Sequence, residues 1–227
     1  MNDKIKLILL SVLVIISCIT MYFKTNQNKI NDAIKFKNEY ETLNNKENNH
    51  GKKYLNLNID TNNNIKYASF KEIENILTQE NGVIYFGFPE CPWCRNIIEP
   101  LLKASEETEL SKIYYFNAYE IRDQKQLNEN NEIITKKEGT EEYKKLIEIM
   151  YDELGEYEGL NNKTIKRLYF PTIVFVKDGK IINTHIGTID EQEDPYTPLT
   201  QKQKDTLKNI YKTYMLEIKD TKCTDKC

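Results

Sequence analysis

Two cysteines separated by two residues, Cys91 and Cys94, are the strongest chemical signal in the sequence. They follow an apolar run and open a segment with helical character, "CPWCRNIIEPLL". At the start of a helix, free N–H groups and the helix dipole favour an anion, so this position favours the thiolate form of Cys91. Cys94, about one helical turn later, is within reach to attack a mixed disulfide formed on Cys91. The pair therefore predicts thiol–disulfide exchange, with Cys91 as the nucleophile and Cys94 as the resolving cysteine.

Two other roles stay open for this pair. A permanent disulfide between cysteines so close in sequence closes a very small loop and would stabilise the fold little. A zinc site would need two further ligands, which Cys223 and Cys227 could supply. Zinc-binding cysteines, however, usually lie on glycine-containing turns rather than between a buried strand and a helix. Exchange chemistry is therefore favoured, with a redox-active Cys91–Cys94 disulfide and with no metal or other cofactor.

The segments around the pair alternate between apolar strands and amphipathic helices. Strands are expected at residues 53–60, 82–88 and 112–121, and helices at residues 69–79, 95–108 and 200–218. Capping boxes are expected at the start of the first and last of these helices. Residues 169–189 predict a β-hairpin that turns at Asp178 and Gly179. The alternation requires parallel strands and the hairpin adds antiparallel ones, so we expect an α/β fold with a central mixed sheet flanked by helices.

The stretch "VIYFGFPECPWC", followed far later by "FPTIVFVKDGK", resembles the thioredoxin superfamily. The resemblance covers residues 53–218 and implies a thioredoxin-like fold in a domain at residues 52–219. It also implies that Pro171 forms a cis peptide bond and lies against Cys91. Within the superfamily, the chain is most similar to membrane-anchored bacterial proteins of the bacteriocin-transport-accessory type.

The resemblance implies a function as well as a fold. We expect an enzyme that acts on protein or peptide thiols and disulfides and that exchanges electrons with a redox partner. The residues expected to contact substrate are Pro92, Trp93, Phe170 and Pro171. Oxidase, reductase and isomerase remain open, because they differ in reduction potential. A redox-silent binding or secretion-accessory module with the same fold is the alternative.

The chain departs from the thioredoxin pattern in three places. Tyr85 stands where thioredoxins have a buried aspartate that assists proton transfer, so the proton must follow another route, through Glu90, water or the substrate. Pro100 falls one residue later than the usual helix kink. Residues 122–168 are an expected helical insertion before the strand of the cis-proline, with a polar loop followed by apolar residues at helical spacing. These apolar residues are Tyr143, Ile147, Met150, Leu154 and Tyr157.

A short basic N-terminus followed by an apolar run predicts a membrane anchor. Residues 7–23 carry no charge, and lysines flank the run on both sides. The run is at the short end for a membrane-spanning helix, and the basic residues favour the cytoplasmic side. We therefore expect residues 1–24 to be a single-pass anchor in the cell membrane, with the domain outside the cytoplasm, where disulfides persist.

A second kind of processing is compatible with the same segment. Ser17 precedes Cys18 after apolar residues, which is typical of lipoprotein signals and would place a lipid on Cys18. Residues 25–51 are polar and are expected to form a linker. Residues 220–227 are expected to be a cysteine-containing tail, whose role is open.

The composition argues against nucleic acid as a partner. The 227 residues carry a formal net charge of −3, so no basic field would attract a phosphate backbone. The only histidines, His50 and His185, are assigned no catalytic role. The expected chemistry therefore resides in the cysteines.

Overall fold

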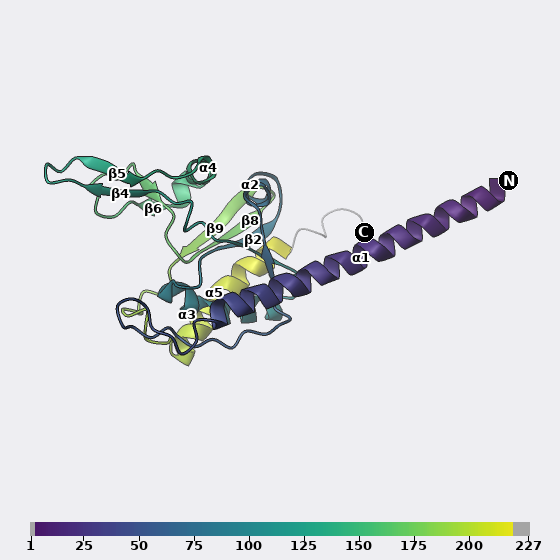
Figure 1. Cartoon of the computed structure of the whole chain (residues 1–227), viewed down its shortest axis with the longest axis horizontal. Helices are drawn as coiled ribbons and strands as arrows, with labels where there is room; N and C mark the ends of the chain where they lie inside the picture. Colours follow the sequence, from purple (N-terminus) through teal and green to yellow (C-terminus); the bar gives the residue numbers. More distant parts are fainter. Residues whose placement is uncertain (1–2, 220–227) are drawn as a thin grey trace.

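The computed structural model describes residues 3–219 and shows a mixed α/β fold around one central sheet (Figure 1). The sheet has five strands in the order β1-β3-β2-β8-β9. Strands β1 and β2 run parallel to β3, whereas β8 is antiparallel to both β2 and β9. The expected central mixed sheet is thus confirmed. Its strands are β1 (Ile65–Tyr67), β2 (Gly82–Phe86), β3 (Ile113–Phe116), β8 (Thr172–Lys177) and β9 (Lys180–Ile186).

Helices cover both faces of this sheet because its central strands are apolar on both sides. Alternate side chains of a strand point to opposite faces. From β2, Val83 and Tyr85 join one core with α1 (Asp3–Glu41), α3 (Pro92–Glu107) and α5 (Gln201–Lys219). Ile84 and Phe86 join the other core with α2 (Phe70–Gln79) and α4 (Glu141–Ile149). This two-sided burial explains the continuous apolar run of β2.

Local signals in the sequence predict several boundaries correctly. Ser69 caps α2, and its side chain and that of Glu72 form the expected reciprocal capping box. Thr200 and Gln203 form the expected capping box of α5. The backbone N–H of Thr200 donates to the Gln203 side chain at 2.8 Å, and the backbone N–H of Gln203 donates to the Thr200 hydroxyl at 3.3 Å. The β8–β9 hairpin turns at Asp178 and Gly179, as expected.

Two segments differ from the expectation. Residues 53–60 are not a strand, and the edge strand β1 comes a few residues later. Residues 122–168 are a mixed rather than a helical insertion, because polar strands with exposed side chains show no apolar periodicity that a sequence pattern could reveal. The insertion comprises β4 (Gln124–Leu127), β5 (Ile133–Lys137), α4, a short 3₁₀ turn (Tyr151–Glu153), β6 (Gly155–Glu156) and β7 (Lys166–Arg167).

The N-terminal helix α1 extends far beyond the body of the molecule (Figure 1). Its residues 10–24 are exposed. Within residues 3–219, no helix has an apolar stretch of the length that crossing a membrane requires. The prediction of a single-pass anchor in the cell membrane at residues 1–24, and of an extracytoplasmic domain attached through it, is therefore wrong. The uncharged run ends at Lys24, and the helix continues with polar residues.

The C-terminal half of α1 packs against the rest of the chain. Ala33, Phe36 and Tyr40 are buried, although residues 25–51 were expected to be a polar linker. Phe36 and Tyr40 contribute to the same core as α3 and α5. Cys18 is an exposed free thiol on α1, and its lipidation stays a prediction. The cysteine-containing tail, residues 220–227, lies outside the described residues.

Gly179 in the hairpin turn gives a stability prediction. Its φ is +68°, and a Cβ there would lie 2.4 Å from the carbonyl carbon of Thr78 in α2. We expect Gly179→Ala to lower the free energy of unfolding by about 3 kcal/mol, because a left-handed conformation and a backbone clash both penalise the methyl group. Gly159 has a similar φ of +81° with open space around it, so Gly159→Ala should cost only about 1 kcal/mol. Equal losses in urea denaturation would contradict the contact between the turn and α2.

Candidate active site

The cysteine pair lies at the junction between β2 and α3. Cys91 is the N-cap residue of α3, and its sulfur accepts a hydrogen bond of 3.2 Å from the backbone N–H of Cys94. The side chain of Cys91 is 5% exposed, whereas Cys94 is fully buried at 0%. Both are free thiols, so the prediction of a Cys91–Cys94 disulfide is corrected to a dithiol. Both cysteines are buried, and Cys91 alone of the two keeps a small exposed fraction.

The start of β8 faces Cys91 from the opposite side. The Phe170–Pro171 peptide bond is cis. The carbonyl oxygen of Phe170 lies 3.6 Å from the Cys91 sulfur and accepts a hydrogen bond from its thiol. Residues far apart in sequence are thus brought together, as the resemblance implies. Pro92 and Trp93 are half-buried on the first turn of α3.

An aromatic cluster with an arginine lies beside Phe170, and the sequence analysis missed it. The ring of Phe88 stacks against Tyr119 at 4.3 Å and meets Phe170 at 5.4 Å between centroids. The guanidinium of Arg122 lies 5.0 Å from the centre of the Phe170 ring. Tyr119 is 40% exposed, so the cluster reaches solvent next to Cys91. Tyr119 and Arg122 follow β3, whose C-terminal end lies at the same edge of the sheet as that of β2. This position after a strand is the signal in the sequence that could have pointed to them.

Arg95, which follows Cys94, is fully buried at 0% exposure. Its guanidinium donates to the carbonyl oxygens of Tyr40 at 2.9 Å, Leu55 at 2.8 Å and Pro89 at 3.2 Å, and to Oδ1 of Asn44 at 3.0 Å. These acceptors belong to the end of α1, to the segment after it and to the loop before Cys91. Arg95 therefore joins the N-terminal segment to the first turn of α3.

Two buried tyrosines meet in the core that α1 and β2 share with α3. The hydroxyls of Tyr85 in β2 and Tyr40 in α1 are 2.7 Å apart, and both side chains are fully buried. Burial raises the pKa of the Cys94 thiol well above its usual value, and Cys91 acts in the same direction. The backbone at Phe88 opposes this rise in the pKa of Cys94. Glu90, which was one of the groups suggested for proton transfer, is exposed.

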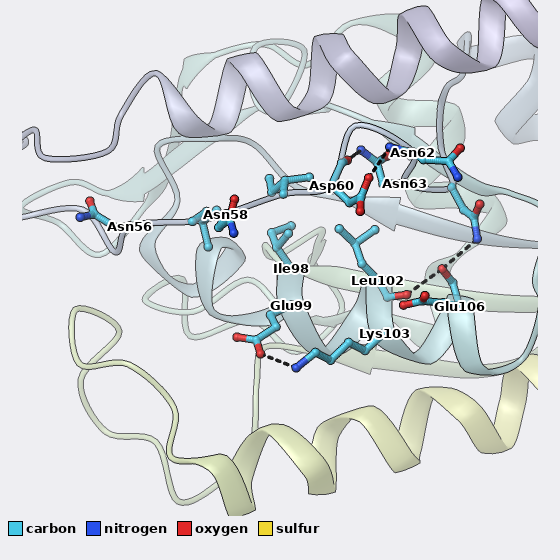
Figure 2. Close-up of a pocket in the computed structure, with 14 residues that line it drawn as sticks. Asn56, Asn58, Asp60, Asn62, Asn63, Ile98, Glu99, Leu102, Lys103 and Glu106 are labelled. Atoms are coloured by element: carbon cyan, nitrogen blue, oxygen red, sulfur yellow. Dashed lines mark hydrogen bonds and ion pairs between the residues drawn. The ribbon is translucent and has the colours of Figure 1, made fainter.

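A groove in the described part of the chain lies away from the cysteines. This groove of about 670 Å³ runs between residues 56–64 and the outer face of the later part of α3. Figure 2 shows that asparagines and charged side chains dominate its walls. None of the candidate site residues lines it.

The described residues also bear on the zinc alternative. Residues 3–219 contain no group of three or more His, Cys, Asp or Glu arranged to hold a metal ion. Cys223 and Cys227, the two further ligands that this alternative invokes, lie outside that range.

Neither the protein-family models nor the curated proteins give a match to this chain. Its function is therefore inferred from the geometry around Cys91 and Cys94.

Proposed function

We propose that this protein is a thiol–disulfide oxidoreductase that acts on protein substrates through Cys91 and Cys94. One observation carries the proposal: two free thiols lie at the start of one helix, the first slightly exposed and the second fully buried. Exchange requires this asymmetry, because one sulfur must engage the substrate and the other must be kept for the second step. A structural role would not need either thiol to be reachable.

The arrangement of the sheet supports a thioredoxin-like fold. Parallel strands β1, β3 and β2 are followed by an antiparallel hairpin, and the cysteines follow the central strand β2. The cis-proline of the resemblance lies at the start of β8, with the carbonyl of Phe170 directed at Cys91. This agreement between motif and topology favours membership of the thioredoxin superfamily.

The proposed reaction is a pair of sulfur displacements. The Cys91 thiolate attacks a substrate disulfide, a bond forms between Cys91 and one substrate sulfur, and the other substrate sulfur leaves and takes up a proton. Cys94 then attacks the Cys91 sulfur and releases the second substrate thiol. The substrate gains two electrons, and the cysteine pair loses two. A dithiol redox partner restores the pair, and the reverse sequence would oxidise a substrate.

The residues around Cys91 have distinct proposed roles. The N–H of Cys94 donates to the Cys91 sulfur, and the first turn of α3 favours its negative charge. Phe170 and Pro171 lie where a substrate chain would approach, so their backbone groups are proposed to align it. Pro92 and Trp93 are proposed to contact the substrate from the first turn of α3.

Reduction of insulin disulfides by a dithiol reductant tests the proposal. The wild-type chain should accelerate the reduction, and Cys91→Ser should abolish the acceleration because the attacking sulfur is gone. Cys18→Ser is the matched control, since Cys18 is an exposed thiol on α1 outside the site, and it should keep full activity. Full activity of Cys91→Ser would favour the redox-silent module instead.

A further inference from the structure

Two of the three arginines in the chain lie close to the segment that faces Cys91. The sequence has 32 basic residues, and all of them except Arg95, Arg122 and Arg167 are lysines. The guanidinium of Arg95 is engaged by four acceptors in the interior. Arg122 and Arg167 are half-buried instead. Because a guanidinium is planar and has five donors, it offers a geometry that a lysine cannot reproduce.

Arg122 is connected to Cys91 through a single residue, Phe170. The guanidinium of Arg122 lies 5.0 Å from the centre of the Phe170 ring and 5.4 Å from that of the Tyr119 ring. The carbonyl oxygen of Phe170 lies 3.6 Å from the Cys91 sulfur. A substrate chain that reaches the sulfur of Cys91 therefore passes close to the charge of Arg122.

Arg167 belongs to the same cluster and comes from β7. Its guanidinium lies 4.2 Å from the centre of the Tyr157 ring, and the Tyr157 hydroxyl accepts a hydrogen bond of 2.8 Å from the backbone N–H of Lys125. The residue after Arg167, Leu168, accepts a hydrogen bond of 3.4 Å at its carbonyl oxygen from Nη1 of Arg122. The insertion thus brings the segments that carry the two arginines side by side.

No acid neutralises these two arginines in the part of the chain that the structure describes. Within residues 3–219, the ion pairs to carboxylates all involve lysines. Asp123, next to Arg122 in sequence, pairs with Lys125 at 3.0 Å. Burial lowers the pKa of Arg122, and the charge of Arg167 acts in the same direction. Two like charges are therefore held together without a counter-charge between them.

The free donors of the pair define the ligand that would fit. The Nε of Arg167 is buried and has no hydrogen-bond partner among residues 3–219, which is costly unless a ligand supplies one. Aromatic rings lie against the faces of both guanidinium groups, and N–H donors point outward from a guanidinium along its edge. Such an edge matches a carboxylate, which accepts two parallel hydrogen bonds. In a protein substrate, the carboxylate is that of an aspartate or glutamate.

We propose that Arg122 and Arg167 bind a carboxylate of the substrate, so that the exchange site prefers cysteines with acidic residues close by in the chain. The inference rests on the proposed function and adds the class of substrate. Both arginines are binding residues, because neither touches a reacting sulfur. The exposed ring of Tyr119, stacked on Phe88 at 4.3 Å, gives the substrate an apolar surface beside the charge.

Three synthetic peptides of equal length test the preference. Each has capped ends and one cysteine that is bound as a disulfide to mercaptoethanol, which is uncharged. The residues on both sides of the cysteine are glutamates in the first peptide, glutamines in the second and lysines in the third. The reduced full chain, with Cys18, Cys223 and Cys227 replaced by serine, is mixed with each peptide, and the rate of reduction is followed by chromatography.

The expected order of rates follows from charge. Each rate is divided by the rate of dithiothreitol with the same peptide, which removes differences in the intrinsic reactivity of the three disulfides. The glutamate peptide should then react about tenfold faster than the glutamine peptide, the ratio expected for one hydrogen bond to a charged group. The lysine peptide should be the slowest. A glutamine peptide with a free C-terminal carboxylate should gain less than the glutamate peptide, and a larger gain would overturn acidic side chains as the ligand.

Paired variants assign the preference to the two arginines. Arg122→Gln combined with Arg167→Gln should abolish the preference for glutamate and leave the rate with the glutamine peptide unchanged. The matched control is Lys112→Gln combined with Lys180→Gln, which removes two exposed cations. Lys112 precedes β3 and Lys180 follows the hairpin turn, so both lie at the opposite end of the sheet from Cys91. This control has the same net charge as the arginine variant and should keep the preference.

Salt gives a test that needs no variant. Raising the salt from about 0.01 M to about 1 M shortens the screening length from about 30 Å to about 3 Å, so the preference of the parent chain should fall. Equal corrected rates with all peptides at low salt, or equal loss of preference in both paired variants, would show that the inference is wrong while the proposed function stands. If the parent chain reduces none of the peptides, the proposed function fails and the inference fails with it.

Discussion

Replacing Cys94 by serine is expected to trap substrate proteins on Cys91 as stable mixed disulfides. The attacking sulfur of the first step is retained, so the bond to the substrate still forms. The resolving sulfur, which is fully buried next to Cys91, is lost, so the bond persists. Incubation with an oxidised protein substrate should give a covalent complex on a non-reducing gel that disappears with reductant.

Two further variants, Cys91→Ser and the double variant, serve as controls for this trapping experiment. Cys91→Ser should form no complex, because Cys94 has no exposed surface from which to reach a substrate. The double variant should behave like Cys91→Ser. If Cys91→Ser traps substrate as well as Cys94→Ser does, the two cysteines do not have the different roles that their burial implies.

Replacing Arg95 by methionine is expected to cause a large loss of stability. Methionine keeps much of the buried chain length but donates no hydrogen bond, so Tyr40, Leu55, Pro89 and Asn44 lose the donor that their oxygens share. Tyr40 and Asn44 keep a donor in the backbone N–H of Leu43 and of Leu57, but the carbonyls of Leu55 and Pro89 lose theirs. This loss of hydrogen bonds should lower the free energy of unfolding by about 3 kcal/mol. Urea denaturation measures this loss.

Lys103→Met is the control for Arg95→Met. Lys103 lies on the same helix and pairs with Glu99 at 2.7 Å, but its side chain is 52% exposed. An exposed ion pair contributes little, so this variant should lose less than about 1 kcal/mol. Limited proteolysis gives a second readout, because Arg95→Met should also open cleavage between residues 42 and 57. Equal stability of the two variants would show that Arg95 does not hold the N-terminal segment to α3.

The cysteine pair and the central sheet were predictable because their signals are local. Two cysteines at fixed spacing, a strand apolar on both faces and an Asp-Gly turn each specify their own conformation. The same holds for the capping boxes of α2 and α5. Phe170 could be placed near Cys91 only through the thioredoxin resemblance, since no local pattern links residues so far apart.

The contribution of α1 was missed for a different reason. Phe36 and Tyr40 recur at helical spacing with Ala33 and Leu43, but the lysines and asparagines around them made the segment look like a polar linker. Their burial depends on a surface formed by β2, α3 and α5, which only the tertiary structure provides. The burial of Arg95 could not be predicted either, because a charged residue is expected at the surface unless its partners are known.

At the insertion and at the N-terminal run, the sequence predicted more than the structure shows. In residues 122–168, the helical spacing of Tyr143 and Ile147, both in α4, was extended across a segment that also contains β4–β5 and β6–β7. In residues 7–23, the absence of charge suggested a membrane span, yet no described helix is long and apolar enough for one.

The redox equilibrium of the cysteine pair tests the central claim most directly. The full chain is equilibrated in buffers with graded ratios of reduced to oxidised glutathione, and free thiols are then alkylated. The protein is digested, and the mass of the peptide that contains Cys91 and Cys94 is measured by mass spectrometry. We predict one two-electron transition from the dithiol of the structure to an intramolecular Cys91–Cys94 disulfide, whose midpoint gives the reduction potential. A peptide that stays a dithiol at every ratio, or that gains only glutathione adducts, would contradict the assignment of an exchange-active pair.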